Sequence, residues 1–321
     1  MNSNATSRVA RTFRGCEVIP LGTFDHTKQE AYGWLVFITV TTIITCPIST
    51  GLNTLIMIAV KTKHRVKTKS NIALSSFPST DTVMGVTGQP LFISWVIAEL
   101  QGNTSSTYCA RIQLARMALR VLGVASLFHL AMVNVERYIA IKHSLRYETL
   151  VTETRLIGVS AVLWIITTLL QLTVPADSID DDDNNYVIVD TGIMFLCIAT
   201  IFFCQVVLYF EIRRHEKEIA SQQVSVEARE KFMKEKKAFK LTTTILFFLM
   251  LSYLPLIASR LLVSKLVITS VNSAYFAFFT CVFTACSNSL LNPMMYCVRM
   301  QQFRVALKEI VLRKSNIQAV N

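Results

Sequence analysis

The run WLVFITVTTIITCPISTGLNTLIMIAV, residues 34–60, contains no charged side chain. A helix needs about 20 apolar residues to cross the ~30 Å hydrocarbon core of a bilayer. The length of this run therefore predicts a membrane-spanning helix. The whole chain agrees, because 52% of its 321 residues are hydrophobic and only 17% are charged, which is too apolar for a soluble protein of two ordinary domains.

Six further apolar runs predict a total of seven spans. Two of the six contain charges: residues 71–98 include Asp81, and residues 112–135 include Arg116 and Arg120. The uncharged ones are residues 156–176, 191–210, 241–259 and 266–298. The sequence shows no internal repeat and no loop large enough to fold separately. We therefore predict an all-α membrane protein with one domain at 34–298, an outer segment at 1–33 and an inner tail at 299–321.

The distribution of lysine and arginine predicts the orientation, since cytoplasmic loops are enriched in both. With the N-terminus outside, the inner loops and tail hold 22 of the 32 basic residues and the outer segments hold six. The predicted outer loop at 177–190, DSIDDDDNNYVIVD, has none. The net charge of +11 then reflects topology and anionic inner-leaflet lipid, and nucleic acid is not an expected partner.

The first thirty residues lack an apolar stretch, so the sequence predicts no cleavable signal peptide and insertion directed by the first span. Asn4 and Asn103 begin glycosylation sequons on the predicted outer face. They favour the plasma membrane over a mitochondrial destination for the arginine-bearing start.

Six of the eight cysteines, at 46, 197, 204, 281, 286 and 297, fall within the spans or at the inner border. We interpret them as small apolar packing residues. Cys16 and Cys109 lie on the oxidising outer side, but spacing alone does not establish a bond between them.

A carboxylate at membrane depth costs several kcal/mol unless it has partners, so Asp81 is a candidate functional residue. In the seventh span Asn288, Ser289 and Asn292 share one helix face, next to Pro293, which cannot donate a backbone hydrogen bond. Together with Ser126 they offer carboxylate, hydroxyl and amide oxygens, a set that suits sodium better than zinc. The alternative is a buried polar network satisfied by water.

Glu136 and Arg137 stand where the third span reaches the inner surface. Arginine can hold a carboxylate through two parallel hydrogen bonds, and a second acid, Glu235, begins the sixth span. One arginine with two possible partners on different helices suits a latch that releases in one state. The alternative is a border charge that reaches out to water.

These residues, in this order within seven spans, resemble the rhodopsin-like (class A) G-protein-coupled receptors. The resemblance covers almost the whole chain. After Tyr296 the sequence CVRMQQFRVALKEIVL resembles the short amphipathic helix of this family, with Phe303, Val305, Ala306 and Ile310 on its apolar side. The matching residues are Asn53, Asp81, Glu136-Arg137-Tyr138, Trp164, Tyr209, Pro255 and Asn292-Pro293-Met294-Met295-Tyr296.

The resemblance implies a receptor, not an enzyme, that activates heterotrimeric G proteins. It implies that Arg137 is the switch residue, Glu136 its near partner and Glu235 its latch to the sixth helix. Tyr209 and Tyr296 would move inward on activation. Asp81, Ser126, Asn288, Ser289 and Asn292 would form a pocket for a regulatory sodium ion.

The sequence departs from the family mainly in its outer half. Tyr253 stands where the family has a tryptophan two residues before Pro255, and the fifth span has no proline. The usual outer disulfide is also missing, since residues 177–190 contain no cysteine. A bond between Cys16 and Cys109 in its place is our prediction.

Two ligand classes of the family are disfavoured. Opsins carry a retinal-binding lysine seven residues before the seventh-helix proline, where this chain has Cys286, so we expect no retinal. Amine receptors carry an aspartate where this chain has Leu119.

Arg116 and Arg120 in the outer part of the third span, with Arg260 in the sixth, favour an anionic ligand instead. The alternative is that these arginines pair with Glu99 or with the aspartates at 180–183. A seven-helix transporter or membrane enzyme is the other class considered, but transporters tend to show repeated halves and this chain does not.

Overall fold

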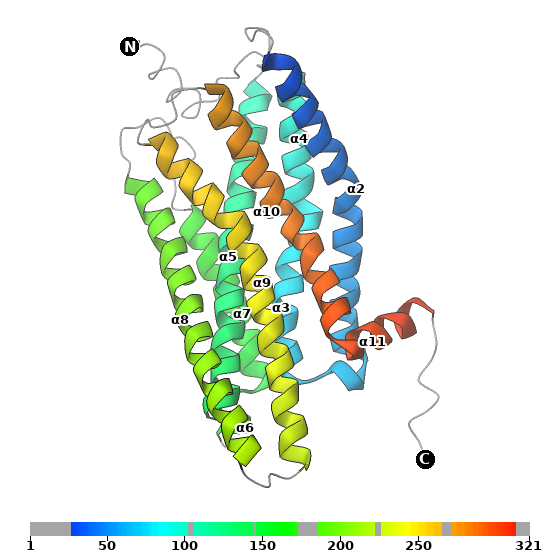
Figure 1. Cartoon of the computed structure of the whole chain (residues 1–321). Coiled ribbons are helices and arrows are strands. Elements are labelled where there is room, and N and C mark those ends of the chain that lie inside the picture. The colour runs from blue at the N-terminus through cyan, green and yellow to red at the C-terminus, as the bar shows by residue number, and fades with distance from the viewer. Residues whose placement is uncertain are drawn as a thin grey trace.

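The computed structural model is all-helical among the residues it describes, which are 27–101, 106–143, 146–172, 185–221, 226–264 and 271–312. Some side chains within these helices also lie outside the described part. Figure 1 shows long helices packed side by side in a bundle, with α2 (Thr27–Thr62) beginning at one end and a short helix, α11 (Gln301–Val311), turning away at the other.

The second apolar run forms one continuous helical segment made of three pieces: α3 (Lys69–Val83), the π-helical turn η3 (Met84–Gly88) and α4 (Gln89–Leu100). Pro90 follows η3 at the start of α4 and has no N–H to donate, which fits a local change of hydrogen-bond register. Gly85 in this turn lies against Thr50 of α2, where an added Cβ would collide with the threonine hydroxyl. The close approach of the two helices therefore requires glycine.

The remaining long helices are α5 (Ser106–Lys142), α7 (Glu153–Leu172), α8 (Asn185–Ser221), α9 (Val226–Ser264) and α10 (Val271–Arg299). Two short elements, η2 (His64–Val66) and α6 (Tyr147–Leu150), lie between longer ones. In the described part of the chain, five helical segments are long and apolar enough to cross a membrane by length and composition: Tyr32–Thr62, Lys69–Leu100, Ala110–Lys142, Glu153–Leu172 and Gly192–Ile219. A shorter apolar stretch, Phe239–Ser252, lies in α9.

Two helix bounds differ from the sequence prediction. Helix α2 begins at Thr27, inside the segment predicted as an outer tail, and α8 begins at Asn185, inside the loop predicted at 177–190. Helices α8 and α9 also continue through the basic segment between the fifth and sixth apolar runs, as far as Ser221 and from Val226. Lysine, glutamate and arginine are good helix formers, so a helix need not end where its apolar face ends.

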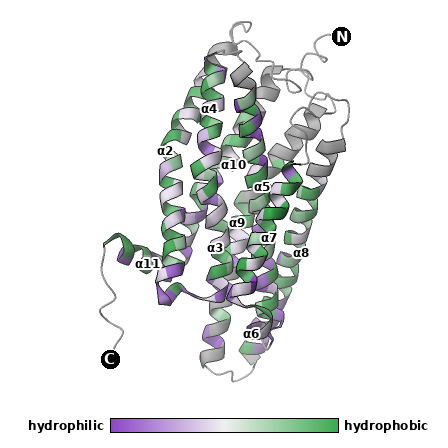
Figure 2. Ribbon diagram, turned by 180° about the vertical axis from the view of Figure 1, so that it is seen from behind, coloured by the Kyte–Doolittle hydropathy of each residue, from purple (hydrophilic) through white to green (hydrophobic). Residues whose placement is uncertain are grey.

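The helices are rich in hydrophobic residues, which Figure 2 colours green along their lengths. On α8, Phe195, Phe202, Phe203 and Phe210 are each at least 64% exposed. Contiguous exposed apolar surface on this scale marks contact with something other than water. In a membrane chain, these side chains face lipid. The core between the helices joins residues from α2, α3, α4, α5, α8, α9 and α10.

Candidate functional site

Glu136 and Arg137 form a buried ion pair near one end of α5. The Arg137 Nε lies 3.0 Å from Glu136 Oε2, and the two residues are only 2% and 3% exposed. A charge at that depth is costly unless it is paired. The alternative of a border charge reaching out to water is therefore wrong for this arginine.

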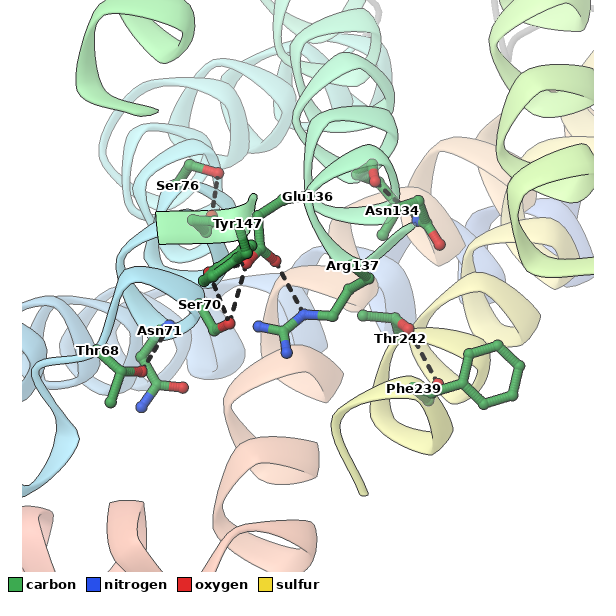
Figure 3. A network of polar contacts seen from close by, with 12 residues as sticks. Thr68, Ser70, Asn71, Ser76, Asn134, Glu136, Arg137, Tyr147, Phe239 and Thr242 are labelled. Atoms are coloured by element: carbon green, nitrogen blue, oxygen red, sulfur yellow. Dashed lines mark hydrogen bonds and ion pairs between the residues drawn. The ribbon is translucent and has the colours of Figure 1, made fainter. Parts of the chain in front are cut away.

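The other carboxylate oxygen of Glu136 is held by two hydroxyls that the sequence did not suggest. Tyr147 of α6 donates to Oε1 at 2.6 Å, and Ser70 of α3 donates to it at 3.0 Å. Figure 3 shows the two hydroxyls and Arg137 gathered around this carboxylate. The acid thus joins three elements of the chain, and hydrogen bonds to a charged group are among the strongest available to a side chain.

Tyr147 is itself held in place by Lys69. The Lys69 ammonium lies 5.8 Å from the centre of the tyrosine ring and 2.5 Å from Glu148 Oε2 on the same short helix. Burial and the neighbouring Glu136 charge raise the pKa of the Tyr147 phenol. The phenol therefore keeps its proton at neutral pH and remains a donor to Glu136.

The predicted latch and other switch residues are only partly described. Glu235, Tyr253 and Pro255 lie in α9, but their side chains are outside the described residues. Tyr209 on α8 is 46% exposed and its hydroxyl accepts a hydrogen bond from Arg213 at 3.3 Å. Tyr138, next to the ion pair, packs its ring edge-on to His143.

On α10, Pro293 lies inside an unbroken helix and Tyr296 is fully buried. The Tyr296 ring stacks on Phe303 of α11 with 5.9 Å between centroids, which fixes the short helix against the bundle. Among the described residues, the Tyr296 hydroxyl has no hydrogen-bond partner. On α11 the buried residues are Phe303, Ala306 and Leu307, whereas the predicted apolar residues Val305 and Ile310 are only partly buried.

All the predicted sodium ligands line one cavity in the middle of the bundle. It is enclosed by α3, η3, α5, α9 and α10, and the space open to the centre of a water molecule is about 10 Å³, roughly enough for one water or small ion. Asp81 is 5% exposed and accepts a hydrogen bond of 2.7 Å from Asn292 Nδ2. The predicted residues in its lining are Asp81, Ser126, Asn288, Ser289 and Asn292.

The donor chemistry of this cavity fits a small cation. One Asp81 carboxylate oxygen accepts from Asn292, and its second oxygen, with the hydroxyls of Ser126 and Ser289, offers hard ligand atoms. Among the residues that the structure describes, the Asn288 amide nitrogen is buried without a hydrogen-bond partner, and one water molecule in the cavity would satisfy it. Asn53 of α2 closes the region nearby by donating to Ser289 O at 2.8 Å.

Three of the predicted ligand residues, Arg116, Leu119 and Arg120, lie in the first half of α5, and Arg260 lies in α9. The Arg116 guanidinium stacks over Trp95 at 5.3 Å, and the same indole donates a hydrogen bond of 3.0 Å to the buried Glu99. The Trp95 side chain thus contacts both a guanidinium and a carboxylate. Leu119 and Arg120 are partly buried on α5.

Several other predictions fall outside the described residues. These are the acidic residues 180–183, the side chain of Arg260, the disulfide between Cys16 and Cys109, and the sequons at Asn4 and Asn103. Cys286, which stands at the opsin lysine position, is buried on α10.

Comparison with known proteins gives one consistent result. The sequence model of the family "7 transmembrane receptor (rhodopsin family)" matches residues 52–296, which include the ion pair and the cavity. Human adenosine receptor A2b is 26% identical over 300 residues, covering 85% of this chain and 89% of the relative. Mouse adenosine receptor A2b is 25% identical over 295 residues, covering 83% and 87%. Human adenosine receptor A2a is 26% identical over 293 residues, covering 81% and 68%.

Proposed function

We propose that this chain, which belongs to the rhodopsin family of seven-transmembrane receptors, is a plasma-membrane receptor that activates heterotrimeric G proteins. The observation that carries the proposal is the buried Glu136–Arg137 pair at the inner end of α5, tied by Ser70 and Tyr147 to two other elements. A permanently charged arginine held this way can act as a switch, because releasing it makes a buried cation available to a partner.

In this proposal five spans are the helical segments that are long and apolar enough to cross a membrane. Helices α9 and α10 supply the sixth and seventh spans. The N-terminus is outside and the C-terminus is cytoplasmic, as the distribution of lysine and arginine favours. Helix α11 lies along the inner membrane face, with Phe303 and Ala306 packed against the helix bundle. Exposed Val311 and Leu312 near its end then face lipid.

The resting arrangement is the one in which Glu136 holds Arg137. Glu235 on α9 acts as a second acid that holds the cytoplasmic end of α9 close to α5. An agonist that binds the open arrangement better shifts the population toward it. Tyr209 and Tyr296 then turn inward to support Arg137, and the G protein binds between the separated helix ends.

A sodium ion in the Asp81 cavity stabilises the resting arrangement. Asp81, Ser126 and Ser289 would hold it, with Asn292 orienting the carboxylate and Asn288 completing the pocket. The ion supplies the positive charge that balances a buried carboxylate. Contraction of the cavity when α10 moves toward α3 would expel the ion, which couples its binding to the state of the switch.

The ligand we propose is a small anion held by Arg116, Arg120 and Arg260. The relatives are named adenosine receptors, so adenosine and its negatively charged phosphate esters are the first compounds to compare. An arginine fork binds phosphate or carboxylate through two parallel hydrogen bonds. The stacking of Arg116 on Trp95 holds one such guanidinium at a fixed angle.

A ligand screen tests this proposal. Cells that express the receptor and a promiscuous G protein are exposed to adenosine, adenine nucleotides and panels of anionic, neutral and cationic metabolites. We expect an anionic agonist whose potency falls when any one of the three arginines is replaced by alanine, with basal activity near normal. A cationic or wholly apolar agonist that is indifferent to all three replacements would refute the anion hypothesis and leave the receptor assignment intact.

A further inference from the structure

A buried amide on α8 connects that helix to both α5 and α9. Gln205 is 6% exposed, and its amide nitrogen donates to Asn134 Oδ1 on α5 at 2.6 Å and to Thr242 Oγ1 on α9 at 3.4 Å. Its amide oxygen accepts from Thr243 Oγ1 on α9 at 2.9 Å. One side chain therefore uses both its donor and its acceptor across three helices, and we call these four residues the amide clasp.

The threonines on α9 and the glutamine on α8 differ in whether they keep a hydrogen bond when the two helices separate. Thr242 and Thr243 each lie 2.9 Å from the carbonyl oxygen of Phe239 in their own helix. Both hydroxyls therefore stay satisfied if α9 moves away. Gln205 has no such substitute, because its surroundings are buried and a polar group left unpaired there is costly. The clasp thus favours the closed arrangement, in which Gln205 has its partners. Helix α9 can still form without the clasp, because its threonines bond within the helix.

The clasp lies beside the switch residues. Asn134 is three positions before Arg137 on α5, and Gln205 is four positions before Tyr209 on α8, so each lies about one helical turn away on the same face. Figure 3 shows Asn134 and Thr242 in the same region as Arg137. A restraint in this place acts on the helix ends that the proposed mechanism separates.

Other contacts of α9 with α5 and α8 are limited. Among the described residues, α9 packs far more extensively against α10 than against either of those helices. An ion pair between Lys236 and Glu216 and an apolar cluster around Leu208, with Phe232 and Phe239 at its edge, supplement the clasp. Because α9 packs so little against α5 and α8, these hydrogen bonds make up a large part of what joins it to those two helices.

We propose that Gln205 is a positioning residue that fastens α9 to α5 and α8 and sets the threshold for their separation. The inference rests on the proposed receptor function for its consequence in signalling, although the restraint itself is a property of the helices. It is distinct from the Glu136–Arg137 pair, because the two sets of contacts share no residue. Its loss leaves the switch intact and makes the open arrangement easier to reach.

The test uses substitutions that preserve shape. Thr243→Val removes the hydroxyl that meets Gln205, and Thr243→Ser restores it. Thr244→Val is the matched control, because the Thr244 hydroxyl donates at 2.7 Å to Lys240 O in its own helix. Gln205→Leu removes the amide at similar volume. Since Thr243 is exposed, valine there is compatible with folding even if the change at Gln205 is not.

Two readouts are taken on the full-length receptor in lipid nanodiscs. The first is the distance between spin labels on unnatural residues at Lys217 of α8 and Lys237 of α9, which are both exposed, measured by pulsed electron resonance. The second is ligand-independent nucleotide exchange on a G protein. We expect Thr243→Val to increase the population of the longer distance and the basal exchange by roughly two- to tenfold, the effect of losing one neutral hydrogen bond. Gln205→Leu removes all three hydrogen bonds of the amide, so it should increase both readouts at least as much.

The outcomes separate this inference from the proposed function. Wild-type distances in Thr243→Val, at wild-type thermal stability, overturn the clasp whatever the exchange rate. An equal shift in Thr244→Val overturns it too, because the effect would then be general to α9. A shift confined to Thr243→Val and Gln205→Leu, with Thr243→Ser normal, supports it. If that shift occurs while neither wild type nor variants promote exchange, the clasp stands and the proposed function fails.

Discussion

Replacing Tyr147 by phenylalanine tests how firmly the buried Glu136 carboxylate is held. The change removes one hydroxyl and keeps the ring that Lys69 contacts. That hydroxyl donates to Glu136 at 2.6 Å. Because the acceptor is only 2% exposed, bulk water has little access to replace the missing donor.

A hydrogen bond to a charged group contributes roughly 1.5 to 3 kcal/mol. Ser70 still donates to the same oxygen at 3.0 Å, so we take the lower end of that range. An equilibrium changes about tenfold for every ~1.4 kcal/mol. If the bond belongs to the resting arrangement, its loss should raise the small active population, and hence basal nucleotide exchange, by about tenfold.

The assay is ligand-independent nucleotide exchange on a G protein in membranes with equal surface expression. Thr149→Val is the matched control, because the Thr149 hydroxyl lies on the same short helix and donates at 2.9 Å to Arg146 O, not to Glu136. We expect the control to behave as wild type. Basal exchange in Tyr147→Phe that equals the control would refute the view that this hydroxyl stabilises the resting arrangement.

Three further predictions address the cavity, the latch and the close approach of two helices. Sodium should raise the melting temperature of wild type relative to a bulky organic cation but leave Asp81→Asn unaffected, since the amide lacks the charge that holds the ion; an equal shift in both would reduce the cavity to a water site. Glu235→Ala should raise basal exchange several-fold, as expected for loss of a contact of roughly 1 to 3 kcal/mol; exchange at the wild-type level would rule out the latch. Gly85→Ala should destabilise the protein by about 1 to 3 kcal/mol through overpacking against Thr50, and Thr50→Ala should restore part of the loss in thermal unfolding; full stability of Gly85→Ala alone would contradict the packing argument.

The sequence predicted five of the residues that line the cavity, because polar residues inside apolar runs are conspicuous. Asp81 is the one charge in its apolar run, and Asn288, Ser289 and Asn292 follow helical periodicity on a single face. Ser126 was added as a hydroxyl from the third span. The ion pair could also be predicted from the sequence, since Glu136 and Arg137 are adjacent in the chain.

Contacts between helices could not be predicted in the same way. Tyr147 meets Glu136 because a short helix returns beneath α5, and Gln205 meets Asn134 across 71 positions of sequence. Such contacts depend on how each helix is rotated about its own axis, which the apolar pattern of a membrane helix defines poorly. Helices α2 and α8 begin at Thr27 and Asn185, ahead of their apolar runs, because polar residues can extend a helix beyond its apolar run.

The most direct test of the receptor assignment is nucleotide exchange with purified components. The wild-type chain in nanodiscs is combined with a panel of heterotrimeric G proteins, and guanine-nucleotide release is followed with and without the agonist found by screening. We predict that at least one G protein releases nucleotide faster with the receptor, and that Arg137→Ala abolishes the acceleration at wild-type thermal stability. Exchange that is unaffected by the receptor across the whole panel, or acceleration that persists in Arg137→Ala, would contradict the switch mechanism built on the Glu136–Arg137 pair.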